Sequence, residues 1–249
     1  MLATAVLALV VVVAGATAAL VARDAPPEPV DQAAEGPVLL VPGYGGSTSA
    51  LEQLAATLQQ AGRTTTIVRA PGDGTGDLRR HAEVLADAAS AALGSGAPSV
   101  DVVGYSAGGV VVRYWVAELG GDGQARRVVS LAAPQHGSDL AALAGDLGSE
   151  TCPTACRQLA PDSDLLRALN AADETPAGPR WVAIWTEDDA TVVPPSSGAL
   201  AGAQSYSGQS VCPGLEVAHG DVPRAPVFQQ LVLLALTGAE PAPPSRAVC

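Results

Sequence analysis

The sequence predicts an α/β fold, in which a mainly parallel sheet carries helices on both faces of one compact domain. Short apolar segments alternate with amphipathic segments over most of the chain, and this alternation is typical of α/β proteins. The apolar segments are continuous rather than interrupted at every second residue, as expected of strands buried on both faces. The chain has 249 residues, 48% of them hydrophobic, which is enough for a sizeable core.

The first predicted strand and helix lie between residues 38 and 62. Residues 38–41 are a run of Val and Leu, as in a buried strand. The next segment has apolar residues at positions i, i+3, i+4 and i+7, which places them on one face of a helix. Ser49 and Glu52 have the spacing of a capping box at the start of this helix, and Gly62 ends it. The apolar face consists of Leu51, Leu54, Ala55 and Leu58.

The same patterns predict the remaining elements. Further strands are expected near residues 65–69, 100–103, 128–132 and 181–185, and further helices near residues 77–93, 107–119 and 226–236, the last ended by Gly238. Residues 72–77 form a Gly- and Asp-rich loop in which Asp77 caps the next helix. This loop matches neither a phosphate-binding motif nor a tandem calcium-binding repeat. Residues 134–179 break the alternation and are predicted to be an insertion over the sheet.

The chain begins with a continuous apolar segment. Residues 2–21 contain only Ala, Val, Leu, Thr and Gly, and a run of 20 such residues can span a bilayer. Ala16-Thr17-Ala18 has the small-x-small pattern that signal peptidase cleaves, although no basic residue precedes the segment. Two interpretations of residues 1–22 follow: a cleaved export signal, which we favour, and an anchor on the outer face of the membrane. Residues 23–36, rich in Pro, Ala and acidic residues, are predicted to be a linker.

The charge of the chain excludes nucleic-acid partners. All 13 basic residues are Arg, against 25 acidic residues, and the formal net charge is −12. Nucleic-acid binding needs basic patches that contact phosphates. An anionic membrane surface would also repel so acidic a protein. The sequence therefore describes an acidic globular domain, which we expect to be a monomer.

Four cysteines behind a predicted export segment indicate disulfide bonds formed in an oxidising compartment. Cys152 and Cys156 suggest a local pair, which leaves Cys212 to pair with Cys249 at the end of a Pro-rich tail, residues 241–249. The second bond would close a long loop and stabilise the fold by roughly 3–4 kcal/mol. The alternative is zinc, but Cys152 and Cys156 lack a nearby His or second Cys pair, so we expect no metal.

A Gly-x-Ser-x-Gly motif lies between a predicted strand and a predicted helix, in the segment Gly104-Tyr105-Ser106-Ala107-Gly108. This context is typical of a nucleophilic serine on a sharp turn, with its hydroxyl exposed where helical N–H groups favour negative charge. We therefore predict Ser106 to be a nucleophile and the Ala107 N–H to be an oxyanion donor. The second donor is expected in the Gly-rich turn at residues 43–46, at Tyr44.

A serine nucleophile needs a base, and the chain has three histidines. His81 lies before Ser106 on a predicted helix with charged neighbours, and is expected on a solvated face. His136 follows a strand end and could line the site, but the base follows the acid along the chain in this architecture. His219 lies after the last predicted strand and before the closing helix, so we predict it to be the base.

An acid must orient this base. Glu187, Asp188 and Asp189 follow the strand predicted at residues 181–185, at the end of the sheet where such sites are built. Three consecutive acidic residues are also typical of a solvated turn. The sequence context by itself leaves both aspartates as candidates.

Six short motifs between residues 36 and 238 carry a family resemblance. They are VPGYGG at residues 41–46, PGDGTGD at 71–77, VGYSAGG at 103–109, APQHG at 133–137, DxxVxP at 189–194 and HG at 219–220. With these motifs the chain resembles the small bacterial class 2, or minimal, lipases and esterases of the α/β-hydrolase fold, particularly secreted actinobacterial members. The resemblance implies a catalytic domain at residues 37–240. It favours Asp189 over Asp188, because the family's acid stands three residues before a Val and five before a Pro.

The resemblance implies that Ser106, His219 and Asp189 hydrolyse carboxylic esters, including lipid esters at a lipid–water interface, without a cofactor or metal. Alternatives are a thioesterase, acyltransferase or perhydrolase with the same residues, and a cell-surface binding protein without catalysis. Two features depart from the family pattern. The turn after the first strand begins with Pro42-Gly43 instead of His-Gly, and residues 134–179 are longer than in the minimal enzymes. The longer segment is a candidate for a partial lid or an altered acyl pocket.

Overall fold

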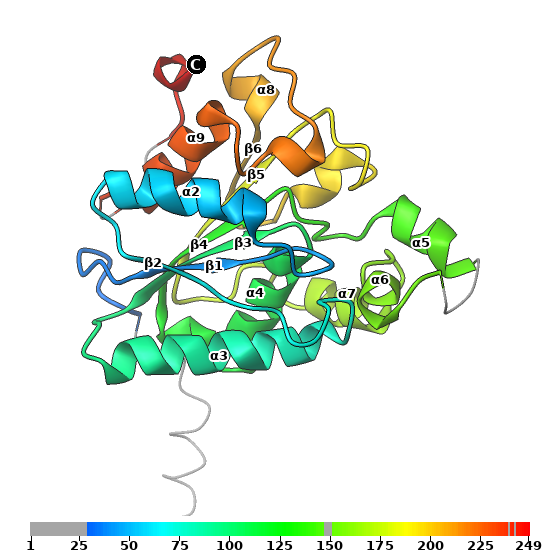
Figure 1. The fold of residues 1–249 in the computed structure, drawn as a ribbon, viewed down its shortest axis with the longest axis horizontal. Helices are drawn as coiled ribbons and strands as arrows, with labels where there is room; N and C mark the ends of the chain where they lie inside the picture. Colours follow the sequence, from blue (N-terminus) through cyan, green and yellow to red (C-terminus); the bar gives the residue numbers. More distant parts are fainter. Residues whose placement is uncertain (1–28, 147–150, 239, 242) are drawn as a thin grey trace, which may run out of the picture.

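Six parallel strands form one sheet in the order β2-β1-β3-β4-β5-β6 (Figure 1). This computed structural model describes residues 29–146, 151–238, 240–241 and 243–249, so the predicted export segment lies outside the described residues. The order of the strands changes direction between β1 and β3, and ligands bind beyond the carboxyl ends of strands at such a switch point. The strands are β1 (Val38–Val41), β2 (Thr65–Ile67), β3 (Val100–Tyr105), β4 (Ala125–Leu131), β5 (Arg180–Trp185) and β6 (Gln204–Ser207).

Helices cover both faces of the sheet, and each face has its own apolar core. Alternate side chains of the strands point to opposite faces. Leu40 and Val103 pack with α2 and α9, whereas Leu39 and Val102 pack with α3, α4 and α7. Figure 1 shows α2 and α9 above the sheet and α3 below it. The main helices are α2 (Ser49–Gln60), α3 (Leu78–Gly94), α4 (Ala107–Glu118), α5 (Asp139–Asp146), α6 (Thr154–Gln158), α7 (Asp164–Ala171), α8 (Gly208–Val211) and α9 (Pro226–Leu236).

The predicted α/β class is confirmed, and the predicted elements are present with small shifts of their ends. Asp77 caps α3 as expected, because its side chain accepts a hydrogen bond from the Arg79 N–H. β6 was not predicted from the sequence, because this short edge strand consists mainly of polar residues and has no apolar run. No helix among the described residues combines the length and the apolar character that crossing a membrane requires.

Two local predictions were wrong. Ser49 is not an N-cap, because it already lies inside α2. Thr48 precedes the helix, and its hydroxyl donates to the Glu52 carboxylate over 2.9 Å without capping a backbone N–H. His81 does not lie on a solvated face, because it is only 5% exposed. It follows Leu78 by three residues and precedes Leu85 by four, so it shares the buried face of α3 with them.

Residues 134–179 form α5, α6 and α7, which lie together beside the carboxyl ends of the strands (Figure 1). α6 contacts α3, α5 and α7, and a disulfide joins Cys156 within α6 to Cys152, which precedes the helix. A second disulfide joins Cys212, after α8, to Cys249 at the C-terminus. This is the pairing expected from the sequence.

A buried ionic network lies at the opposite end of the sheet from these helices. The fully buried Asp101 accepts hydrogen bonds from Arg126, over 2.5 Å, and from Arg63, over 2.6 Å. Arg126 also donates to the carbonyls of Leu236, at the end of α9, and of Gln32. Part of the segment predicted to be a linker therefore contacts the sheet and α9.

Candidate active site

Ser106 occupies the turn between β3 and α4 in a strained backbone conformation. Its φ of 53° and ψ of −129° are unusual for a residue with a side chain. The turn is possible because glycines stand at its close contacts. A Cβ on Gly104 would lie 2.5 Å from the Gly108 carbonyl oxygen, and a Cβ on Gly108 would lie 2.4 Å from that of Val41. The Ser106 side chain is therefore held at the carboxyl end of the central strands.

His219 lies beside this serine, in a 3-10 turn at His219–Asp221. Its Nε2 is 3.0 Å from the Ser106 Oγ, and its Nδ1 is 2.6 Å from the Asp189 Oδ2. The ring of Tyr105 stacks on the imidazole with centroids 5.3 Å apart. The Tyr105 hydroxyl also donates to the His219 carbonyl over 3.0 Å. Burial raises the pKa of Tyr105 to about 12, so this hydroxyl keeps its proton at neutral pH.

The two candidate acids, Asp188 and Asp189, have different partners. Asp189 is buried, and its Oδ1 accepts hydrogen bonds from the N–H groups of Thr191 and Val192, which leaves Oδ2 for His219. Asp188 instead accepts from the Val217 N–H over 3.1 Å, two residues before His219. Asp189 therefore contacts the imidazole, whereas Asp188 holds the loop that carries it.

The two predicted oxyanion donors, Tyr44 and Ala107, flank the serine. Ala107 is the first residue of α4, and Tyr44 lies in the turn after β1. In the part of the chain that the structure describes, neither N–H donates a hydrogen bond to another protein group. The turn that contains Tyr44 is held by a hydrogen bond from the Gly45 N–H to the Gly74 carbonyl, over 3.1 Å. The loop at residues 72–77 thus supports the turn that contains Tyr44.

His81 and His136 lie apart from this constellation. The His136 Nε2 is 2.8 Å from the Glu174 carboxylate, and its Nδ1 is 3.2 Å from the Ser197 carbonyl. His81 is buried in α3, and burial lowers its pKa. Neither residue contacts Ser106, so the structure brings only His219 to the serine.

Arg113 links α4, the helix that follows Ser106, to the α7 region, and nothing in the sequence predicts this role. It projects from α4, is 1% exposed, and donates to the Leu169 carbonyl, the Asn170 side chain and the Glu174 carbonyl. Burial lowers the pKa of Arg113 to about 10, so it remains charged at neutral pH. Its position among the apolar residues 110–116 of α4 gives no signal that it fixes the α7 region to this helix.

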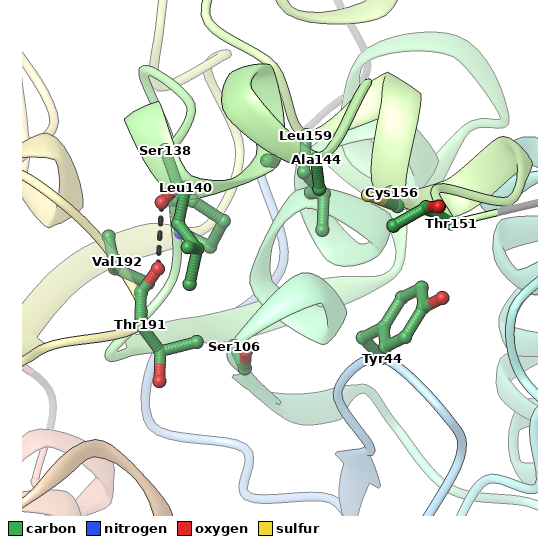
Figure 2. A pocket seen from close by; sticks show the side chains of 12 residues that line it. Tyr44, Ser106, Ser138, Leu140, Ala144, Thr151, Cys156, Leu159, Thr191 and Val192 are labelled. Atoms are coloured by element: carbon green, nitrogen blue, oxygen red, sulfur yellow. Dashed lines mark hydrogen bonds between the residues drawn. The ribbon is translucent and has the colours of Figure 1, made fainter. Parts of the chain in front are cut away.

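Two cavities meet at Ser106. The first encloses about 250 Å³ and is mainly apolar. Figure 2 shows Ala144 and Leu159 on one side of this cavity and Tyr44 on the other. The second encloses about 300 Å³ and is lined by His219 and Arg224. Tyr44, Ser106 and Thr191 line both cavities. The remaining residues of the first are Pro134, Ser138, Leu140, Ala141, Thr151, Cys156 and Val192.

Comparison with known proteins supports the resemblance inferred from the sequence. Residues 92–211 match the family model described as Lipase (class 2), a segment that contains Ser106 and Asp189 but ends before His219. A comparison with curated protein sequences finds no match. The predicted resemblance to class 2 lipases is confirmed over the matched segment.

Solved structures share the fold. Aspergillus fumigatus lipase B is 21% identical with a TM-score of 0.73, over 86% of this chain and 56% of that one. The mature form of a Bacillus licheniformis lipase is 17% identical with a TM-score of 0.65, over 85% of this chain and 94% of that one. A pyrethroid hydrolase from Sphingobium faniae is 15% identical with a TM-score of 0.51, over 82% of this chain and 99% of that one. The chain thus spans little more than half of the Aspergillus lipase, and it has the α/β-hydrolase fold.

Proposed function

We propose that this protein is a serine hydrolase that cleaves carboxylic esters through an acyl-enzyme intermediate. The observation that carries the proposal is the chain of two contacts at Ser106, His219 and Asp189: 3.0 Å from Oγ to Nε2 and 2.6 Å from Nδ1 to Oδ2. These distances suit a nucleophile, its base and the acid that orients the base. The match to a class 2 lipase family model supports the same chemistry.

In the first half of the reaction, His219 Nε2 takes the hydroxyl proton as Ser106 Oγ attacks the ester carbonyl carbon. Asp189 accepts the hydrogen bond from His219 Nδ1 and stabilises the imidazolium that forms. The carbonyl oxygen becomes an oxyanion held by the N–H groups of Tyr44 and Ala107, each worth roughly 3 kcal/mol in the transition state. Collapse of this intermediate breaks the bond to the alcohol oxygen, which receives the proton from His219.

In the second half, water replaces the alcohol. His219 takes a proton from the water as its oxygen attacks the acyl carbon, and the same two N–H groups hold the second oxyanion. Collapse releases the carboxylic acid and returns the proton to Ser106 Oγ. Each step uses groups of this chain and water.

The substrates are proposed to be lipid esters met at a lipid–water interface. Among the described residues, Tyr44, Leu140 and Leu143 are the large apolar side chains that are exposed. Two of them line the apolar cavity, and Leu143 lies on the same helix as Leu140. Exposed apolar side chains gathered at the entrance to a site favour contact with an apolar surface. The net charge of −12 favours an uncharged lipid surface over an anionic one.

The protein is proposed to act outside the cytoplasm as a monomer, after secretion or while anchored to the outer face of the membrane. Its two disulfides are typical of oxidising compartments, and residues 2–21 have the composition of an export segment. N-terminal sequencing of the exported protein tests this, because a first residue beyond position 18 indicates cleavage.

The ester-hydrolase proposal is tested with p-nitrophenyl esters of graded acyl length. Wild type should release p-nitrophenol, and Ser106→Ala should lose at least about a thousandfold in kcat. Ser95→Ala, a change of an exposed serine at the end of α3, should leave the rate unchanged. Wild type inactive on every ester would refute the function, and an active Ser106→Ala variant would refute the nucleophile.

A further inference from the structure

The two cavities that meet at Ser106 differ in their access to the base. His219 lines the second cavity but not the first. In the proposed mechanism the leaving alcohol oxygen receives its proton from His219 Nε2, so this oxygen must lie within hydrogen-bond reach of that atom. The alcohol part of an ester therefore extends into the second cavity. The acyl chain takes the first, where Ala144, Leu159 and Val192 offer apolar contacts.

The second cavity has a cationic side chain at its edge. Arg224 lines it and is 44% exposed. Among the described residues that line either cavity, Arg224 is the only one with a permanent positive charge. Thus any anionic group of a substrate finds its favourable partner on the alcohol side of Ser106.

The guanidinium of Arg224 is available to a ligand. Its nearest carboxylate, that of Asp221, is 3.9 Å away, beyond hydrogen-bond distance, and Asp221 does not line the cavity. Within the described chain, the Arg224 side chain donates no hydrogen bond to another residue. Most other arginines near the sheet do have such partners, as Arg113 and Arg126 illustrate. A guanidinium with free donors can bind a phosphate or carboxylate through two parallel hydrogen bonds.

We propose that the second cavity receives the alcohol part of the ester and that Arg224 selects alcohols that carry an anionic group, such as a phosphate. This inference rests on the proposed ester hydrolysis and names the class of leaving group. The lining of this cavity is more polar than that of the first, and Ser47 and Ser49 supply further hydroxyls to it. Both features favour an alcohol part that carries an anionic group. The acyl part of the substrate remains uncharged.

The test compares two substrates that share one acyl group: the monobutyrate of glycerol and the monobutyrate of glycerol 3-phosphate. Arg224→Gln should lower kcat/KM for the phosphorylated ester at least about tenfold, as expected when charge-assisted hydrogen bonds are lost from a partly exposed site. The same variant should change kcat/KM for the neutral ester less than about twofold. Arg224→Lys, which keeps the charge, should recover part of the loss.

Arg167→Gln is the matched control. Like Arg224, Arg167 is exposed and has an aspartate three residues earlier, Asp164, although Arg167 is hydrogen-bonded to it and lines neither cavity. It should alter neither substrate's kcat/KM. Added salt should weaken the wild-type preference for the phosphorylated ester and leave Arg224→Gln unaffected.

The outcomes separate the two proposals. If Arg224→Gln lowers kcat/KM equally for both esters, Arg224 has a structural role. This result would overturn the inference but leave the esterase function in place. A wild type that prefers the neutral ester, with no change in Arg224→Gln, would overturn it as well. A wild type inactive on both esters and on p-nitrophenyl esters would refute the hydrolase function itself.

Discussion

Gly43 lies against Ser106 so closely that a Cβ atom on Gly43 would stand 2.9 Å from the Ser106 Cβ and 3.3 Å from its Oγ. The two residues come from the turns after β1 and β3, which are neighbours in the sheet. The backbone around Tyr44 can therefore approach the nucleophile only if position 43 has no side chain. The proposed oxyanion donor and the proposed nucleophile depend on this single contact.

Gly43→Ala is accordingly expected to impair catalysis more than stability. The added methyl group must displace either the Ser106 side chain or the turn, and a displacement of about 1 Å can cost roughly a hundredfold in kcat. Steady-state hydrolysis of p-nitrophenyl butyrate measures the effect, with thermal unfolding as a check on folding. Gly76→Ala is the control, because a Cβ there meets no atom within 4 Å and its φ is not in the left-handed region. A variant at position 43 with wild-type kcat would contradict the proposed oxyanion geometry.

The two neighbouring aspartates should respond differently to the same substitution. Asp189→Asn removes the charge that faces His219 Nδ1 and is expected to reduce kcat by several orders of magnitude, roughly ten-thousandfold for a triad of this type. Asp188→Asn keeps an oxygen that can accept from the Val217 N–H and should cost less than about tenfold. Pre-steady-state and steady-state rates of ester hydrolysis by both variants decide which aspartate orients His219. Similar losses in the two would mean that the acid is wrongly assigned.

His81 is expected to make the protein less stable in mildly acidic solution. Burial lowers its pKa from 6.5, so the unfolded chain binds a proton more readily than the folded one. Above pH 6.5 the residue is neutral in both states and has no effect. As the pH falls below 6.5, only the unfolded state gains the proton, so the free energy of unfolding decreases. Urea unfolding between pH 7 and pH 5 should show this decrease in wild type and a smaller one in His81→Gln.

The pH range distinguishes His81 from the carboxylates. Asp77 has a lowered pKa: burial opposes the shift, but the hydrogen bonds from Gln158 and Arg79 outweigh it. The contribution of Asp77 to the free energy of unfolding is present above pH 3.8, its ordinary pKa, and is lost only below that pH. If the free energy of unfolding decreases equally in wild type and His81→Gln between pH 7 and pH 5, groups other than His81 cause the decrease.

The two disulfides should stabilise the fold to different extents. The Cys212–Cys249 bond spans 37 residues and the Cys152–Cys156 bond spans 4. The loop-closure entropy lost from the unfolded chain corresponds to about 4 kcal/mol for the longer loop and about 2 kcal/mol for the shorter. Double replacements by Ala, compared by chemical denaturation, test this order. If removal of the Cys152–Cys156 bond lowers the free energy of unfolding more than removal of the Cys212–Cys249 bond, the entropy of the unfolded chain is not the main source of stabilisation.

The apolar cavity should limit the length of acyl chain that gains binding energy. Its volume of about 250 Å³ equals about eight groups of roughly 30 Å³, which is the share of a water molecule and close to that of a methylene. kcat/KM for dissolved p-nitrophenyl esters should therefore rise by up to about fourfold per methylene and level off near eight carbons. Ala144→Leu narrows the cavity and should move this plateau to shorter chains.

Ala142→Leu is the matched control for that cavity. It lies on the same helix, α5, but lines a separate surface hollow. The substitution adds the same atoms and should leave the chain-length profile unchanged. If the plateau of kcat/KM against chain length moves in both variants, or in neither, the acyl chain does not occupy the space beside Ala144.

The patterns that are local in sequence predicted much of this molecule. The continuous Val and Leu runs gave β1 and β3, because a strand buried on both faces needs apolar residues at every position. The Gly-x-Ser-x-Gly spacing located the turn at Ser106, because the chain there needs residues without side chains at the close contacts. Helix periodicity likewise located α9 to the residue.

Residues that act through neighbours remote in sequence were decided only by the tertiary structure. No local pattern shows that Arg113 holds the α7 region, that Gly74 supports the turn at Tyr44, or that β6 completes the sheet. The burial of His81 was in principle readable from its spacing to Leu78, but its charged neighbours on α3 suggested the opposite.

The composition and local spacing of the sequence thus determined the fold class, the turn at Ser106 and the candidates for its partners. The tertiary structure decided which candidates meet, because only packing brings the turns after β1, β3 and β5 to one edge of the sheet together with His219. It also decided the shape of the site. The first cavity exists because α5 and α6 pack beside that edge. The second exists because Arg224 and His219 leave a space, with a more polar lining than the first, on the other side of Ser106.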